Sequence, residues 1–180
     1  MNNNSNIQVR RLGPSDAATY RTLMLEAYER HPEAYTSTVA ERGSLPLSWW
    51  EARVSPDANA IEMVLGAFKG SRLSGVAGLS FEAREKARHK ATLFGMYVPA
   101  AARGRGIGRA IVDAALAHAR SRTGIRVVQL TVTQGNAPAE ALYEQCGFIP
   151  FGVEPLAISV DGRFAAKVHM WCDLAQAGLR

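Results

Sequence analysis

Three glycines at alternate positions, with arginines between and beside them, form the stretch of this chain whose chemistry is easiest to read. They stand in Arg103-Gly-Arg-Gly-Ile-Gly-Arg109, after an apolar run that ends before Pro99 and at the start of an alanine-rich segment. Glycine has no Cβ atom, so the backbone N–H groups beside it can approach an anion closely, and the start of a helix adds the positive end of a dipole. The stretch therefore predicts a phosphate-binding loop.

Two other phosphate-binding motifs do not fit this loop. A Walker A loop needs Lys followed by Ser or Thr after its last glycine, whereas Arg109 follows Gly108 here. The dinucleotide fingerprint GxGxxG, counted from Gly104, would need a glycine where Arg109 stands, and it also needs an acidic residue about 20 residues further on. The sequence lacks both, so these two nucleotide motifs are excluded.

The apolar periodicity predicts the elements that must position the loop. Seven strands are expected, at residues 7–12, 61–68, 72–81, 91–98, 127–133, 148–160 and 164–174. Four helices are expected, from Ser15 or Asp16 to about Arg30, and at residues 46–53, 107–122 and 136–145. Residues 31–44 are polar and turn-prone, and we expect no helix there. The tryptophans at 49 and 50 are expected to pack in the core or, as an alternative, to belong to a mobile lid.

These elements together predict a mixed α/β (α+β) fold with a mostly antiparallel sheet of about seven strands and about four helices. The three strands between residues 61 and 98 are close in sequence and lead antiparallel into the glycine loop. The helix expected at 107–122 separates strands 91–98 and 127–133, which implies a right-handed crossover and a parallel pair. Asp161-Gly162 is a strong signal for a final hairpin turn.

Composition limits the class of protein. A chain of 180 residues with 47% hydrophobic residues predicts one domain, here residues 7–175, after a disordered stretch at residues 1–6. The net charge of +5 is spread along the chain, which favours an anionic ligand over nucleic acid. Two separated cysteines indicate neither a disulfide framework nor a metal site, and no run of 18 apolar residues predicts a membrane span. We therefore expect a cytoplasmic protein.

Further residues downstream of the loop form a pattern together with it. Asn136 lies at the start of an expected short helix, Tyr143 lies within that helix, and Gly147-Phe148 begin the next strand. With the R-x-x-G-x-G run of residues 103–108 and the expected order of elements, the chain resembles the GCN5-related N-acetyltransferase (GNAT) superfamily. The resemblance extends from about residue 7 to residue 174, and its specific motifs lie in residues 93–148.

The resemblance implies that the chain binds acetyl-CoA. The amides of residues 103–109 would hold the pyrophosphate, and the backbone of residues 96–98 would pair with the pantetheine arm like an added strand. An amide at the end of that strand could also polarise the thioester carbonyl. Asn136 is either a plain helix cap or a cap that also contacts the cofactor. The implied cofactor-binding residues are Met96, Tyr97, Val98, Arg103, Gly104, Arg105, Gly106, Ile107, Gly108, Arg109, Asn136 and Tyr143.

The same resemblance gives Tyr143 the role of the catalytic acid that protonates the departing thiolate, with a packed aromatic as the alternative. Many relatives carry a glutamate on the strand before the loop, but residues 90–98 hold no carboxylate, and Thr92 stands at the equivalent position. Base catalysis from that strand is therefore in doubt.

Several groups stay open as the base that deprotonates the amine. Glu33, Glu82 and His89 are candidates, and so is a chain of water molecules. His169 stands in an alternating strand and is expected to be an ordinary sheet residue.

Two classes of function follow from the resemblance. The first is an N-acetyltransferase that moves the acetyl group of acetyl-CoA to a primary amine, on a small molecule or a peptide, by direct attack in a ternary complex. The second is a non-catalytic binding module, above all a CoA-binding regulator. In either case we expect a monomer or a homodimer without nucleic acid, membrane or metal.

Overall fold

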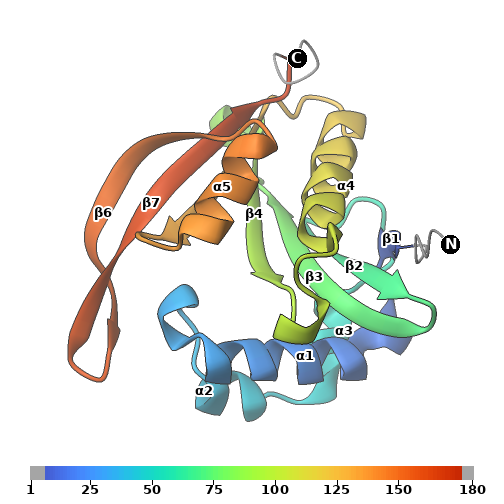
Figure 1. Cartoon of the computed structure of the whole chain (residues 1–180). Coiled ribbons are helices and arrows are strands. Elements are labelled where there is room, and N and C mark those ends of the chain that lie inside the picture. Colours follow the sequence, from blue (N-terminus) through green and yellow to red (C-terminus); the bar gives the residue numbers. More distant parts are fainter. Residues whose placement is uncertain (1–6, 176–180) are drawn as a thin grey trace, which may run out of the picture.

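A seven-stranded sheet is the centre of the computed structural model, which describes residues 7–175 (Figure 1). The expected disorder of residues 1–6 lies outside the described residues. The strands are β1 (Ile7–Arg11), β2 (Glu62–Lys69), β3 (Arg72–Phe81), β4 (Lys90–Tyr97), β5 (Val127–Thr133), β6 (Ile149–Val160) and β7 (Arg163–Asp173). Their order in the sheet is β1-β2-β3-β4-β5-β7-β6.

Five α-helices lie in the described residues, one more than expected. They are α1 (Ala17–Arg30), α2 (Val39–Gly43), α3 (Leu47–Arg53), α4 (Ile107–Ser121) and α5 (Ala137–Gln145). The unexpected one is α2, in the segment predicted as turns. Thr38 caps it, because its side chain accepts from the N–H of Glu41 while the Glu41 carboxylate accepts from the N–H of Thr38. This T-x-x-E capping box was readable in the sequence.

The pairing of the strands confirms the predicted sheet. Strands β2, β3 and β4 are antiparallel neighbours, and β4 runs parallel to β5. Strand β7 pairs antiparallel with both β5 and β6, so the last hairpin folds back and inserts β7 between them. Asp161 and Gly162 both have positive φ angles of 50° and 76° at its turn, as a two-residue hairpin with a type I′ turn requires.

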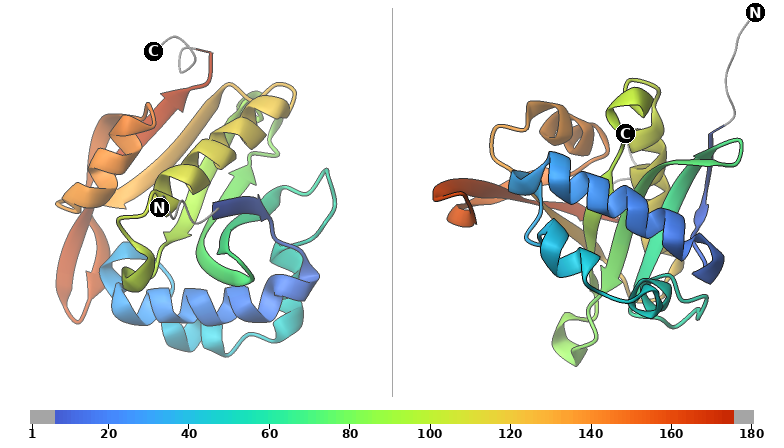
Figure 2. Two further views of the ribbon diagram at one scale, coloured as in Figure 1. Left: turned by 45° about the vertical axis from the view of Figure 1, so that its right-hand side comes forward. Right: turned by 90° about the horizontal axis from the view of Figure 1, so that it is seen from below.

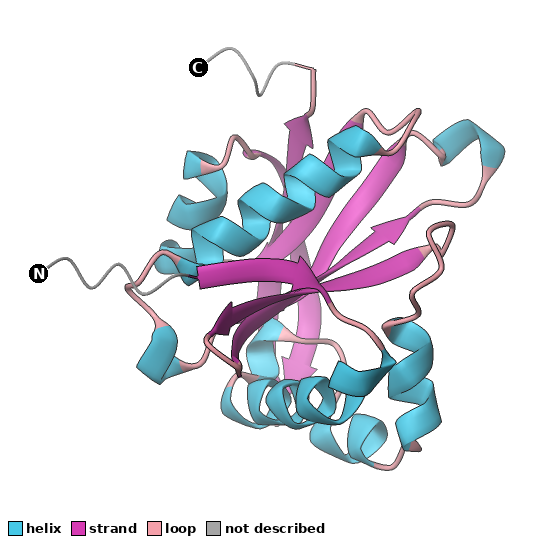
Figure 3. Ribbon diagram, turned by 90° about the vertical axis from the view of Figure 1, so that its right-hand side faces the viewer, coloured by secondary structure: helices cyan, strands magenta, loops and turns pink. Residues whose placement is uncertain are grey.

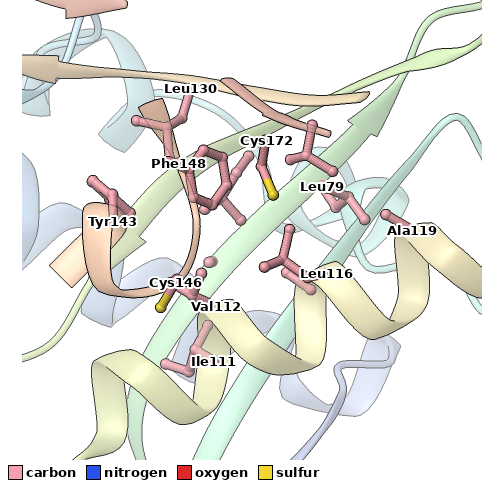
Figure 4. Close-up of a cluster of buried hydrophobic side chains, with 14 of the residues drawn as sticks. Leu79, Ile111, Val112, Leu116, Ala119, Leu130, Tyr143, Cys146, Phe148 and Cys172 are labelled. Carbon is pink, nitrogen blue, oxygen red and sulfur yellow. The ribbon is translucent and has the colours of Figure 1, made fainter. Parts of the chain in front are cut away.

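Helices cover both faces of the sheet and enclose two apolar cores (Figures 2 and 3). One core lies under α4 and α5, where Ile111, Val112 and Leu116 pack on β3 and β5 (Figure 4). The other lies under α1 and α3, where the fully buried Trp50 stacks edge-on against Tyr20. The core expectation for Trp50 is thus confirmed.

A bulge in β4 shapes the sheet next to the glycine loop. The register between β3 and β4 shifts between the pairs Val76 with Tyr97 and Gly78 with Phe94, and Gly95 takes a φ of +58° there. A Cβ on Gly78 would overlap the Phe94 ring, so a larger residue cannot replace it without moving that ring. The bulge bends the last residues of β4 away from the regular hydrogen-bond ladder with β3.

Candidate active site

One cavity of about 1180 Å³ runs along the end of β4 and brings together segments that are far apart in the sequence. The glycine loop and the start of α4 form one end, and α5 lies beside them. The ends of β4 and β5, the segment between α1 and α2, and β7 form the rest. The cavity is somewhat larger than the roughly 300–1,000 Å³ that is usual for a small-molecule site, so it has room for a long ligand.

The glycine loop presents free N–H donors to this cavity. Gly104 and Gly106 have φ angles of +72° and +77°, and a Cβ at either would meet no atom within 4 Å. In the described part of the chain, the N–H groups of residues 104–109 donate to no backbone or side-chain acceptor. The first helical turn of α4, which begins at Ile107, leaves such donors unpaired by its geometry. The loop thus fits a pyrophosphate through donors and open space.

The three loop arginines lie in different places. Arg103 and Arg109 line the cavity, whereas Arg105 is exposed and does not line it. The Arg103 guanidinium donates to the carbonyl of Val98 at 2.9 Å and lies 3.0 Å from Nε2 of His31. Arg109 forms an exposed ion pair with Asp113, 3.4 Å long. Two of the three arginines can therefore add charge to the cavity.

The strands β4 and β5 separate where the cavity begins. Their parallel pairing covers only Lys90, Ala91 and Thr92 on β4, so the backbone from Leu93 to Tyr97 has no strand partner on the β5 side. This free edge lines the cavity with Val98 beside it. A free strand edge is the feature that an extended chain of amides needs for added-strand pairing.

Tyr143, on α5, lies beside this free edge of β4. Its side chain is 8% exposed, its ring stacks edge-on against Phe148, and its hydroxyl lies 3.5 Å from Sδ of Met96. Burial raises the pKa of the Tyr143 hydroxyl to about 12, with a smaller contribution from Cys146. The hydroxyl thus keeps its proton at all physiological pH values and points at the free end of β4.

Asn136 lies at the other end of α5. Its side-chain oxygen accepts from the N–H of Ala139 at 3.4 Å, so it caps the helix as predicted. It also lines the cavity, so its cap role and a ligand contact are compatible.

Tyr35 is a site residue that the sequence analysis missed. Its hydroxyl donates to the carbonyl of Met96 at 2.7 Å, from the segment between α1 and α2. Burial raises its pKa, and the neighbouring Tyr143, Tyr28 and Tyr97 add to that rise. This bond attaches the wall of the cavity to the free end of β4.

Lys167 was missed as well. It is only 6% exposed, and its Nζ donates to the carbonyls of Glu33 and Ala34 and to Oγ1 of Thr133. Burial lowers its pKa. The lysine thus fastens the segment before Tyr35 to β5 and β7. A lone lysine in an alternating strand gave no signal for this role.

The candidate bases differ in whether they line the cavity. Glu82 and His89 stand before the first β4 to β5 pair, and neither lines the cavity. Glu33 and Thr92 do line it. His169, expected to be an ordinary sheet residue, also lines it, with Nε2 2.9 Å from Oε2 of Glu154.

The fold and the cavity are of the kind expected of a CoA-type acyltransferase, and comparison with known proteins identifies the family. Residues 20–148 match the model of the acetyltransferase (GNAT) family. The chain belongs to this family, whose acetyl donor is acetyl-CoA. The predicted superfamily and fold class are thereby confirmed.

The chain is also similar to individual members of known function. Mycothiol acetyltransferase of Salinispora tropica is 28% identical over 134 residues, which are 74% of this chain and 41% of that protein. The chain thus spans about two fifths of that relative's length.

Two solved structures share the fold. A GNAT-family acetyltransferase from Streptococcus pneumoniae superposes with a TM-score of 0.83 at 21% identity, covering 92% of this chain and 98% of that one. The yncA protein of Salmonella typhimurium, solved with its cofactor acetyl-CoA, has a TM-score of 0.77 at 23% identity over 94% and 95% of the two chains.

Two further findings concern metals and membranes. Among residues 7–175, no group of three or more His, Cys, Asp or Glu side chains could hold a metal ion. In the same range, none of the helices combines the length and the apolar character that a membrane crossing demands.

Proposed function

We propose that this chain is an N-acetyltransferase that moves the acetyl group of acetyl-CoA to a primary amine by direct attack, with both substrates bound together. The observation that carries the proposal is that one cavity joins the glycine loop, the free edge of β4 and the Tyr143 hydroxyl. A direct transfer needs these three features in one place, because donor, acceptor and proton donor must meet.

The chain's own groups divide the binding of acetyl-CoA between them. The N–H groups of residues 104–109 bind the pyrophosphate, whereas the N–H of Arg103 already donates to the carbonyl of Ala100, so Arg103 contributes through its side chain. The backbone of Met96–Val98 pairs with the pantetheine amides. Asn136 and Tyr143 contact the cofactor from α5. The cofactor supplies an acetyl group activated as a thioester.

Tyr143 acts as the acid. Its hydroxyl holds its proton because burial raises its pKa, and it faces the end of β4 where the bond to sulfur would break. Donation of a proton to a leaving group by a positioned side chain contributes about 10²–10⁴ in rate.

The acceptor amine has to lose a proton before it attacks. An alkylammonium of pKa about 10.4 is mostly charged at neutral pH. Within residues 7–175, Glu33 is the one carboxylate that lines the cavity, and its side chain is exposed. We therefore propose that the proton of the acceptor amine leaves along a chain of water molecules to Glu33 and bulk solvent.

Binding and turnover experiments test the proposal. Acetyl-CoA at about 100 times its Kd should raise the Tm by roughly 5–10 °C, since such binding adds about 2.7 kcal/mol. A panel of primary amines should then release CoA thiol. No shift in Tm would contradict both CoA hypotheses, and a shift without release from any amine would favour the regulatory module.

The proposal also includes a cytoplasmic location and an oligomeric state of one or two chains. Cys146 and Cys172 are buried free thiols, which suits the reducing cytoplasm that we propose. The chain works as a monomer or a homodimer, and the exposed apolar side chains of β6 and β7 favour the homodimer; they are Ile149, Phe151, Val153, Leu156 and Phe164. Light scattering after gel filtration distinguishes the two states.

A further inference from the structure

The acceptor side of the cavity lies on one face of the sheet. On β5, Val128, Leu130 and Val132 are buried in the core under α4 and α5, so the residues between them face the other way. Gln129 and Thr131 thus face the segment between α1 and α2, and both line the cavity. An amine that attacks from the side opposite α4 meets this wall.

Basic groups outnumber acidic groups around the cavity. In the described part of the chain one carboxylate lines it, that of Glu33, whereas its basic lining side chains are His31, Arg42, Arg103, Arg109, Lys167 and His169. A polyamine acceptor carries several positive charges and would need several carboxylates here. The lining is unsuited to such an acceptor.

Most of these basic side chains either belong to the glycine loop or already have a hydrogen-bond partner. Arg103 and Arg109 belong to the glycine loop, Lys167 donates to two carbonyls, and His169 lies beside Glu154. Arg42 differs, because no carboxylate of residues 7–175 lies within ion-pair distance of it. It is the free positive charge of the acceptor side.

The Arg42 side chain is held in place at one end only. Its Nε donates to Oγ of Ser37 at 2.9 Å, and its guanidinium carbon lies 4.7 Å from the centre of the Trp49 ring. The two terminal nitrogens donate to no acceptor within the described residues. A stacked guanidinium with both terminal nitrogens free is suited to bidentate binding of a carboxylate.

Tyr28 lines the same cavity as Arg42 and provides a second donor there. Burial raises the pKa of its hydroxyl, and the positive charges of Arg42 and Arg53 oppose that rise. Its ring packs edge-on against Tyr35, with centroids 5.2 Å apart, and the Tyr35 hydroxyl donates to the carbonyl of Met96. Contacts therefore run from Tyr28 through Tyr35 to the end of β4.

We propose that the acceptor is a small amine that also carries a carboxylate, as an amino acid does, and that Arg42 and Tyr28 bind this carboxylate. The inference rests on the proposed acetyl transfer and adds the substrate class. With the carboxylate at Arg42, the amine of the same molecule lies in the cavity that the free end of β4 also lines. Arg42 is then a specificity-determining residue.

The test compares L-leucine and L-phenylalanine with their amides, which lack the charge, and with spermidine. For each amine, kcat/KM is measured with wild-type protein and with Arg42→Met. Loss of a charge-assisted pair should lower kcat/KM for the amino acids about 10- to 100-fold and leave the amides within about threefold. Because each amine is compared between the wild-type and variant proteins, its own basicity cancels.

Controls separate specificity from folding. Arg53→Met removes the other guanidinium that stacks on Trp49, but Arg53 pairs with Glu62 and does not line the cavity, so the preference for amino acids should persist. The Tm shift caused by acetyl-CoA should be the same in wild-type and Arg42→Met protein. Arg42→Lys keeps the charge and should recover part of the amino-acid activity.

Calorimetry of L-leucine and leucinamide binding to the CoA-saturated protein gives a readout independent of turnover. Equal use of acids and amides, a preference for spermidine, or equal losses for both in Arg42→Met would overturn the carboxylate site. Arg42-dependent binding of L-leucine without CoA release from any amine would overturn the acetyl transfer and leave the carboxylate site standing.

Discussion

The Tyr143 hydroxyl lies 3.5 Å from the sulfur of Met96, and this contact joins α5 to the end of β4 where that strand has left β5. The two residues are 47 positions apart in the chain. Their contact places a proton donor, which burial keeps protonated, beside a free strand edge.

The first prediction concerns the acid. Tyr143→Phe should keep acetyl-CoA binding and lower kcat at least tenfold, because a positioned acid contributes about 10²–10⁴. Steady-state kinetics and the Tm shift with acetyl-CoA measure the two effects. Tyr20→Phe is the matched control: burial also raises the pKa of Tyr20 to about 12, but Tyr20 lies on the buried face of α1 and outside the cavity. Unchanged turnover in Tyr143→Phe would end the assignment.

The pH profile tests the same residue in a different way. The Tyr143 pKa is raised to about 12, so the hydroxyl stays protonated through pH 10 and causes no loss of activity there. The rate should therefore rise with pH as the amine loses its proton and then level off. A decline between pH 8 and pH 10 in wild-type protein that is absent from Tyr143→Phe would contradict the raised pKa.

The second prediction concerns the glycine loop. Gly106→Glu should abolish acetyl-CoA binding, because a negative side chain would occupy the phosphate site, as calorimetry can measure. The control is Gly70→Glu, which places the same side chain at a φ of +61° in the β2 to β3 turn, away from the cavity. It shares the backbone strain and should still bind. Equal loss in both variants would show that strain, and not the phosphate site, is responsible.

The third prediction concerns Lys167. Lys167→Met should raise the KM for the amine with little effect on acetyl-CoA binding, because it frees the segment at Glu33 and Ala34 from the sheet. Kinetics with each substrate varied in turn measures this. An exposed lysine, Lys69 on β2, gives the matched control Lys69→Met, which should leave both KM values unchanged. A change confined to the acetyl-CoA KM would contradict the positioning role.

The lowered pKa of Lys167 also predicts a pH effect on stability. The folded protein binds this proton less tightly than the unfolded chain, in which the pKa is near 10.5. Between the lowered pKa and 10.5 the unfolded chain holds more protons, so the free energy of unfolding contributed by this group rises with pH. Urea unfolding over that range should show a smaller rise for Lys167→Met than for wild type. Identical pH dependence would contradict the shift.

The fourth prediction concerns acid stability. The hydrogen bond from Arg10 is the main cause that lowers the pKa of Asp16, and the N–H of Gly13 adds to it. The stabilisation is present above the unfolded pKa and is lost as the pH falls through the folded pKa. Asp16→Asn should cost about 1 kcal/mol or less at pH 7 and nothing near pH 2. Asp113→Asn, which breaks an exposed pair, is the comparison, and an equal cost at both pH values would refute the linkage.

Local patterns in the sequence accounted for most of the elements. Strand β3 lies at residues 72–81, as its strand-like run beside a hairpin turn predicted, strand β5 lies at residues 127–133, as its β-branched residues predicted, and α4 begins at Ile107 as expected. These features depend on neighbours within one or two turns. The short helix α2 could also have been found, because its Thr38 and Glu41 capping box is local.

The conformation of the loop and the cap at Asn136 were likewise determined by local sequence. Gly104 and Gly106 take positive φ angles because no side chain hinders them, and Asn136 caps α5 because its oxygen reaches the first turn. Both effects act over a few residues, so their spacing can be read directly.

The acceptor wall was decided only by the tertiary structure. Period-two alternation puts His169 and Lys167 on one face of their strand, but the insertion of β7 between β5 and β6 decides that Lys167 on this face meets Glu33 and Ala34. Arg42 acquires its place in the same way, because a helix of five residues carries it to Trp49. Local spacing determines which way a side chain points, whereas strand order and helix packing determine what it meets.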